Sequence, residues 1–177
     1  MTYSIAQLNQ MSQDEFVAAI GGVFENTPNI VRQVWEKRPF ADVTELYERL
    51  EDAVFLLSQD EQIALIRAHP DLGSKAKMAN ASLQEQAGAG LDRLTSEEFD
   101  RFQTLNAAYQ ERFGFPFVIA VRNHTKESIL EAFDRRLENP SDTEIDQALE
   151  EITQIAEFRL LDLVESPQPS GNLPVNS

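Results

Sequence analysis

Three helix-start signatures, each followed by apolar residues at helical spacing, constrain the fold of this chain more than any other feature. They are Ser12-Gln13-Asp14-Glu15, Ser58-Gln59-Asp60-Glu61 and Thr95-Ser96-Glu97-Glu98, and each has the spacing of a capping box. After the third, apolar side chains recur three or four positions apart at Phe99, Phe102, Leu105, Tyr109 and Phe113, which is typical of a helix with one buried face. The only strand candidate is the apolar run Phe117-Val118-Ile119-Ala120-Val121. We therefore expect an all-α fold.

The same periodicity predicts the remaining helices and their number. Further helices are expected around residues 30–35, 43–57, 60–68, 125–137 and 142–164. A chain of 177 residues with 42% hydrophobic residues can bury one substantial core. We expect a single compact domain of about seven to nine helices over residues 1–165. Residues 166–177, rich in Pro, Ser, Gly and Asn, are expected to form a flexible tail.

Composition excludes several classes of function. The chain has no cysteine, which excludes thiolate metal sites and cysteine nucleophiles. It has neither a His-x-x-x-His pair nor a phosphate-binding glycine loop, so we expect no metal and no cofactor. The formal charge of −15 argues against nucleic acid and anionic lipid as partners. Without a signal peptide, an apolar run of about 18 residues or a peroxisomal tripeptide, a cytoplasmic protein with no membrane association is expected.

The segment Arg67–Gly73 interrupts the helical pattern at a histidine. Pro70 disfavours the α conformation at His69 and so ends the preceding helix. The imidazole is then at a helix C-terminus, where the macrodipole favours its protonated form. A histidine in this position could exchange protons near neutral pH. The alternative is that His69 only ends the helix.

One arginine occupies an unexpected place in the last predicted helix. Between Glu138 and Glu165 there are nine acidic residues and a single base, Arg159. Arg159 follows the spacing of the apolar stripe made by Ile145, Leu149, Ile152, Ala156 and Leu163. A buried guanidinium requires an anion. Arg159 either extends to solvent or pairs with a structural carboxylate, or it binds a planar anionic or carbonyl-rich ligand through two parallel hydrogen bonds.

Two further segments allow a structural and a functional interpretation. Ser82 and Glu85 have capping-box spacing and could simply begin a helix, or Glu85 and Gln86 could point into a pocket at the helix start. The run Phe117–Val121 is most simply core, but its backbone polar groups need partners that an amide-rich ligand could supply. A base, a carboxylate, an amide and an isolated arginine would suit proton transfer and stabilisation of an anionic intermediate. The residues by themselves name no substrate.

Four motifs in series resemble one enzyme family. They are His69-Pro70-Asp71-Leu72-Gly73, Ser82-x-x-Glu85-Gln86, Phe113-Gly114-Phe115-Pro116-Phe117-Val118-Ile119, and Arg159. Their order and spacing are similar to those of the 2-oxo-4-hydroxy-4-carboxy-5-ureidoimidazoline (OHCU) decarboxylases over roughly residues 1–165. The resemblance implies an all-α homodimer that produces (S)-allantoin in urate degradation without metal or organic cofactor. Some members carry a fused hydroxyisourate hydrolase domain, for which the tail after Val164 is too short.

The resemblance also implies roles for individual residues. His69 would be the catalytic acid/base and Glu85 its partner carboxylate. The substrate, OHCU, would be bound by Pro70, Ser82, Leu83, Gln84, Gln86, Arg159 and the backbone of Phe117, Val118, Ile119, Ala120 and Val121. Whether His69 first removes the 4-hydroxyl proton or only donates to carbon stays open from the sequence.

Two alternatives to the decarboxylase remain. A divergent member of the family could use the same pocket on another ureido or imidazole ring. A non-enzymatic helical interaction module would instead use His69 as a helix end and pair Arg159 with an internal acid. Convergence of His69, Glu85 and Arg159 in one cavity would favour an enzyme.

Overall fold

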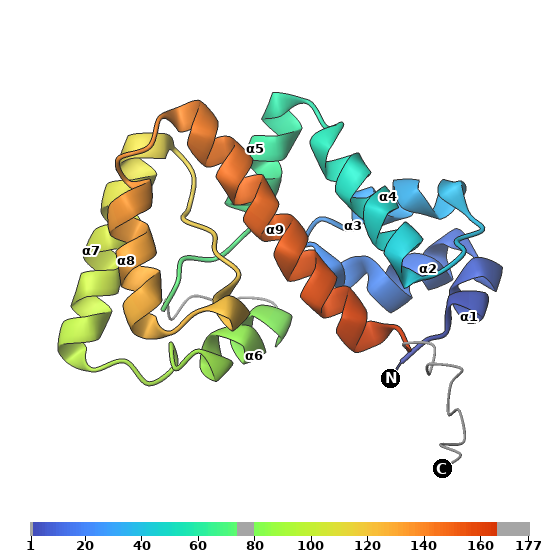
Figure 1. The fold of residues 1–177 in the computed structure, drawn as a ribbon, viewed down its shortest axis with the longest axis horizontal. Helices are drawn as coiled ribbons and strands as arrows, with labels where there is room; N and C mark the ends of the chain where they lie inside the picture. The colour runs from blue at the N-terminus through green and yellow to red at the C-terminus, as the bar shows by residue number, and fades with distance from the viewer. Residues whose placement is uncertain (1, 74–79, 166–177) are drawn as a thin grey trace, which may run out of the picture.

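The computed structural model describes residues 2–73 and 80–165, and this part of the chain is built from helices (Figure 1). The α-helices are α1 (Ile5–Gln10), α2 (Gln13–Ile20), α3 (Pro28–Val34), α4 (Val43–Phe55), α5 (Gln59–Arg67), α6 (Asn80–Gly88), α7 (Ser96–Phe113), α8 (Lys126–Arg136) and α9 (Ser141–Leu163). Three short 3-10 helices are η1 (Gly21–Val23), η2 (Trp35–Lys37) and η3 (Val121–Asn123). The predicted all-α fold of seven to nine helices is confirmed. The predicted tail, residues 166–177, lies outside the described residues.

Helix α9 is the element around which the others are arranged. In Figure 1 it crosses the molecule diagonally, with α1–α4 on one side of it and α6–α8 on the other. Its apolar stripe is buried along most of its length, and the helix packs against α2, α4, α5 and η1. Arg159 lies on this stripe, as predicted, with a relative exposure of 5%. The helix therefore brings one cation to the interior, where the two sides of the molecule meet.

Local sequence signals explain most helix boundaries. The boxes beginning at Ser12, Ser58 and Thr95 cap α2, α5 and α7, each with both reciprocal hydrogen bonds. The alternative that Ser82 caps a helix is wrong, because α6 begins two residues earlier and Ser82 lies within it. Helix α1 was not predicted, although Ser4 caps it through a capping box completed by a glutamine.

Aromatic side chains fix the segment after α7 in the core. The Phe117 ring stacks on Phe133 of α8 with centroids 3.8 Å apart, and Tyr109 of α7 meets it edge to face at 5.2 Å. Burying such rings stabilises the fold by roughly 1.5–3 kcal/mol each. The run Phe117–Val121 is not a strand: within the described ranges the only β pairing is the isolated bridge between Tyr3 and Val164. Instead, the segment is extended, buried and enters η3.

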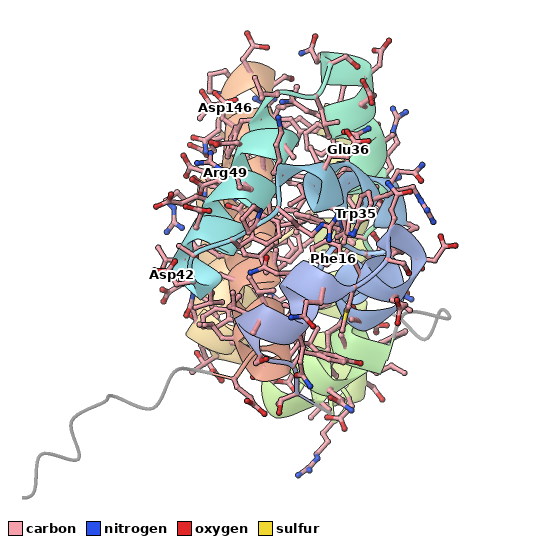
Figure 2. The ribbon with its side chains drawn as sticks, turned by 90° about the vertical axis from the view of Figure 1, so that its right-hand side faces the viewer. Phe16, Trp35, Glu36, Asp42, Arg49 and Asp146 are labelled. Carbon is pink, nitrogen blue, oxygen red and sulfur yellow. The ribbon has the colours of Figure 1, made fainter. Side chains whose placement is uncertain are left out.

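The N-terminal helices pack as a second aromatic cluster, viewed from their own side in Figure 2. Phe16 of α2 stacks on Phe40 with centroids 6.1 Å apart. The Trp35 indole donates to the Met11 carbonyl at 2.9 Å, and the Arg38 guanidinium covers its ring. These contacts hold α2, η2, the end of α1 and the loop after η2 against one another. None of the described helices combines the length and apolar character that a membrane crossing requires.

Candidate active site

One cavity gathers residues from four distant parts of the chain. They come from the turn after α5, from α6, from the extended segment before η3, and from α9. The cavity is lined by His69, Pro70, Leu72, Ser82, Glu85, Gln86, Phe117, Val118, Ile119, Val121, Ile155 and Arg159. His69, Glu85 and Arg159 thus converge, which is the arrangement that favours an enzyme over an interaction module.

The turn that carries His69 is fixed at three points. The Nδ1 atom of His69 lies 3.0 Å from the Leu65 carbonyl in the last turn of α5. Asn106 of α7 donates to the Leu72 carbonyl at 2.9 Å. The Gly73 backbone N–H donates to the Gln86 side-chain oxygen at 3.0 Å. Gly73 has a φ of +69°, a conformation that glycine adopts without the strain it imposes on other residues. The imidazole is therefore held by backbone geometry and not by a carboxylate.

The protonation state of His69 differs from the sequence-based prediction. Burial lowers the pKa of His69 to about 4, because removing the charged form from water outweighs the stabilising effects of the Leu65 carbonyl and Glu25. The predicted macrodipole effect, which favours the protonated form, is thus overcome by desolvation. Since a carbonyl oxygen only accepts, Nδ1 carries the proton of the neutral ring. Nε2 then has a lone pair, and it has no hydrogen-bond partner among the described residues.

Arg159 is bound by two carboxylates. Its Nε and Nη2 donate to the two oxygens of Glu85 at 2.9 and 2.8 Å, which is a bidentate pair. Nη2 also lies 3.1 Å from Glu25 Oε2 and 3.0 Å from Ser82 Oγ. Nη1 donates to the Gly22 carbonyl at 3.1 Å. Of the two structural alternatives for Arg159, pairing with internal acids is correct and extension to solvent is wrong.

These acids keep the guanidinium charged inside the protein. Burial would lower the pKa of Arg159, but the hydrogen bonds and negative charges of Glu85 and Glu25 raise it above its ordinary value. Ser82 Oγ donates to Glu25 Oε2 at 2.7 Å. Because Ser82 donates its hydroxyl proton to Glu25, its oxygen can only accept a hydrogen bond from Arg159. Glu85 is paired with Arg159 and has no hydrogen bond to His69 in this structure.

The extended segment at the cavity is held by charged side chains behind it. Arg136 of α8 donates through Nη1 to the Val118 carbonyl at 2.7 Å and through Nε to Glu144 at 2.8 Å. Glu144 also accepts from Tyr109 at 2.5 Å. The Ala120 N–H donates to Glu151 of α9 at 3.4 Å. The Val118 carbonyl and the Ala120 N–H, which were expected to bind a ligand, are thus hydrogen bonded within the protein.

Comparison with known proteins shows the family to which this chain belongs. The family model described as OHCU decarboxylase matches residues 9–161. The chain belongs to the OHCU decarboxylase family. A 2-oxo-4-hydroxy-4-carboxy-5-ureidoimidazoline decarboxylase from Haloferax volcanii is 41% identical over 163 residues, which cover 92% of this chain and 97% of that protein.

Some of the similar proteins are longer than this chain. The uric acid degradation bifunctional protein of Bacillus sp. (strain TB-90) is 42% identical over 159 residues, 90% of this chain but 32% of that protein. A crystal structure of (S)-allantoin synthase matches with a TM-score of 0.75 and 27% identity over 93% of this chain and 55% of that one. An OHCU decarboxylase structure at 21% identity has a TM-score of 0.67 and supports the fold.

Not every residue that the family resemblance nominated reaches the cavity. Leu83 and Gln84 are exposed on the outer face of α6, and Ala120 does not line the cavity. The other nominated residues do line it. Sequence reasoning missed Ile155, which is one helical turn before Arg159 on the same stripe, so the spacing could have found it. It also missed Glu25, a lone acid before Asn26 that carries no motif signal.

Within this family fold, the cavity has the parts for acid–base chemistry on a polar ring. The lone pair of His69 can accept a proton. Arg159 and Ser82 offer a cation and an acceptor, and Ile155 and Phe117 supply apolar walls. No group of three or more His, Asp and Glu side chains that could bind a metal occurs in residues 2–73 and 80–165. The arrangement suits proton transfer to and from a small anionic ligand.

Proposed function

We propose that this protein decarboxylates OHCU to (S)-allantoin in the degradation of urate. Its membership of the OHCU decarboxylase family and its 41% identity to a decarboxylase of that name support the assignment. The observation that carries the proposal is the convergence, in one cavity, of an unpartnered His69 Nε2 with Glu85 and Arg159. Because these three residues are far apart in the sequence, most of the chain must fold before they meet.

The neutral state of His69 supports an order for the proton transfers. A neutral imidazole with a free Nε2 acts first as a base, so it removes the proton of the substrate's 4-hydroxyl group. The C4–carboxylate bond then breaks, CO₂ leaves, and its electron pair moves through C4 and C5 to the ring C=N bond. The protonated His69 next donates its proton to C5 as the oxygen at C4 becomes a carbonyl. A proton from water, taken up at the ring nitrogen, completes the balance.

The walls of the cavity account for the stereochemistry. Phe117 and Ile155 line the cavity with apolar side chains, and His69 is the proposed donor of the proton to carbon. Delivery from one side of a fixed planar intermediate gives a single enantiomer, whereas uncatalysed protonation reaches both faces and gives a racemate. Arg159 stabilises the negative charge that develops on the ring and its oxygen.

A coupled assay tests this function. Urate oxidase and hydroxyisourate hydrolase generate OHCU, and circular dichroism follows the formation of allantoin with and without the protein. We expect faster decay together with optical activity of the S enantiomer. His69→Asn keeps a donor for the Leu65 carbonyl but removes the base, and should slow turnover by about 10²–10⁴-fold. Racemic allantoin at the uncatalysed rate with the wild-type protein would refute the assignment.

We also propose that the protein acts in the cytoplasm and as a homodimer. The family resemblance supports the dimer, and the exposed apolar side chains of Phe55, Leu56, Leu83 and Leu161 are available for a subunit contact. Light scattering coupled to size-exclusion chromatography should give twice the 20.0 kDa mass of the chain. A mass of one chain across micromolar concentrations would contradict the dimer. Cell fractionation tests the compartment.

A further inference from the structure

Arg136 of α8 is a buried cation directly behind the wall of the cavity. Its relative exposure is 3%, and it is not among the residues that line the cavity. Its Nε donates to Glu144 at 2.8 Å, and its Nη1 donates to the Val118 carbonyl at 2.7 Å. The guanidinium also lies over the Phe117 ring, 4.3 Å from the ring centroid. These contacts fix the Val118 carbonyl on the α8 side of the extended segment.

Glu144 holds Arg136 in this orientation. Its carboxylate is completely buried, and it also accepts from the Tyr109 hydroxyl at 2.5 Å and from the Asn139 side-chain amide at 2.9 Å. Arg136 Nη2 has no hydrogen-bond partner among the described residues, so the Val118 carbonyl is the one polar group besides Glu144 that Arg136 binds there. A buried ion pair is by itself weak evidence for stability. What this pair fixes is the orientation of one peptide group.

The orientation of the Val118 carbonyl sets the direction of the next N–H. The peptide bond between Val118 and Ile119 is trans, and in a planar trans peptide the C=O and N–H bonds point in opposite directions. Because the carbonyl points toward Arg136, the Ile119 N–H points away from it. Ile119 is buried and lines the cavity, and among residues 2–73 and 80–165 its N–H has no hydrogen-bond partner. A buried N–H without a partner costs free energy that an acceptor on a ligand can recover.

We propose that Arg136, held by Glu144, is a positioning residue that presents the Ile119 N–H to the cavity, where this N–H donates to a carbonyl oxygen of the ureide ligand. This role rests on the proposed function, because OHCU and allantoin both carry ring and ureido carbonyls that can accept. Arg136 itself touches no reacting atom and acts through the peptide group. Without Arg136 that peptide group is free to rotate, since within the described ranges no strand pairs with the segment.

A merely structural role of Arg136 makes a different prediction. If Arg136 only satisfies the Val118 carbonyl, its loss should lower stability without changing how the folded protein binds its ligand. If Arg136 positions the Ile119 N–H, its loss should weaken substrate binding more than it slows the chemistry. A group that binds the substrate equally in the ground state and the transition state changes KM and leaves kcat unchanged. The split between KM and kcat therefore separates the two roles.

One NMR signal reports on both sides of this peptide group. Val118 and Ile119 form the only Val-Ile sequence in the chain, so ¹³C at the valine carbonyl and ¹⁵N in isoleucine give a single correlation in an HNCO spectrum. Its carbon belongs to the carbonyl that Arg136 binds, and its proton is the proposed donor. The probe is (S)-allantoin, and calorimetry gives the concentration that saturates the protein. We expect the Ile119 proton of the wild type to move downfield at saturation.

Removal of the buried ion pair as a unit tests the role of Arg136. The double variant Arg136→Met/Glu144→Gln leaves neither charge unpaired in the interior, so it should fold. Tyr109→Phe is the matched control, because it removes another hydrogen bond to Glu144 and leaves the Val118 carbonyl bound. If the double variant does not fold, Arg136→Lys replaces it, since an ammonium group cannot bind Glu144 and the carbonyl through one rigid fork.

The positioning role predicts a specific change in the kinetics. The double variant should raise the KM for OHCU about tenfold, with kcat changed by less than about twofold. Its Val118 carbon signal should already differ from that of the wild type without ligand, and its Ile119 proton should move less when allantoin saturates the protein. In Tyr109→Phe, KM and kcat should both stay within about twofold of the wild type.

Several results would overturn this role. A wild-type Ile119 proton that does not move downfield at saturation would show that the N–H does not bind the ligand, and this measurement requires no variant. An unchanged KM in the double variant, or an equal rise in Tyr109→Phe, would show that Arg136 is only structural. A fall in kcat alone would place its effect on the chemical step and would also contradict the proposal. Failure of the proposed function is distinct, because the wild type would then form no (S)-allantoin from OHCU above the uncatalysed rate.

Discussion

The buried, neutral His69 predicts a specific loss of stability in acid. In the folded protein its pKa is about 4, compared with an ordinary value of 6.5. Above pH 6.5 the imidazole is neutral in the folded and the unfolded chain, and its contribution to stability is fully present. As the pH falls below 6.5, the unfolded chain binds a proton first, so unfolding is favoured. The loss is complete near pH 4, where the folded form also becomes protonated.

The size of this effect follows from the same two values. Each pH unit between them corresponds to about 1.4 kcal/mol, so the loss between pH 6.5 and pH 4 is about 3 kcal/mol from His69 alone. Because the ring is buried, solvent does little to screen its charged form. Against a typical stability of about 5–15 kcal/mol, a loss of this size is easily measured.

Urea unfolding of the wild type and His69→Asn at pH 7, 6, 5 and 4 isolates this contribution. Carboxylates titrate in both proteins, so their effect cancels in the difference between the two free energies of unfolding. We expect that difference to change by about 3 kcal/mol in favour of the variant as the pH falls. In a His124→Asn background His69 is the sole histidine, and ¹⁵N chemical shifts report its tautomer and titration directly. A pH-independent difference, or an imidazole that titrates at 6.5 or above, would refute the reasoning.

Two further predictions concern the frame around the cavity. Arg136→Ala should lower the free energy of unfolding by about 3–5 kcal/mol, because it leaves Glu144 as a buried, uncompensated charge. Urea unfolding measures this loss. The control is Arg135→Ala on the exposed face of α8, which should change the free energy of unfolding by less than about 0.5 kcal/mol. Equal effects of the two changes would contradict the role of the buried pair. Gly73→Ala should cost about 1–2 kcal/mol through its positive φ, whereas Gly88→Ala, which meets no neighbour, should cost nothing. Thermal denaturation compares the stabilities of the two variants. A fully stable Gly73→Ala protein would show that the turn adopts another conformation.

Sequence reasoning predicted the elements of the fold well for identifiable physical reasons. Capping boxes and apolar spacing are local signals, and they gave α7, α8 and α9 to within about two residues of their observed ends. Helix α1 escaped prediction because it is only six residues long and its box ends in glutamine. The segment Phe117–Val121 has the composition of a strand, but the described structure offers it no strand to pair with, and side chains of α8 and α9 bind its backbone instead.

The site was less predictable because its contacts are distant in sequence. The spacing on α9 placed Arg159 on the buried face, but nothing local indicated that Glu25 would meet it. The pKa of His69 was predicted in the wrong direction, since the helix position is visible in the sequence and the depth of burial is not. Glu85 was correctly expected to point into a pocket, yet its observed partner is Arg159. Its proposed role beside His69 stays a prediction.

The bonds of Arg159 have a consequence for the order in which the chain acquires activity. They join residues separated by 137 positions at Gly22, 134 at Glu25 and 74 at Glu85. Contacts of such long sequence separation form slowly, because large loops must close first. On the ribosome, α1 to α8 emerge before the helix that completes the site. Catalysis should therefore appear late in refolding, after most helical signal has returned, and a nascent chain should remain inactive until α9 has docked.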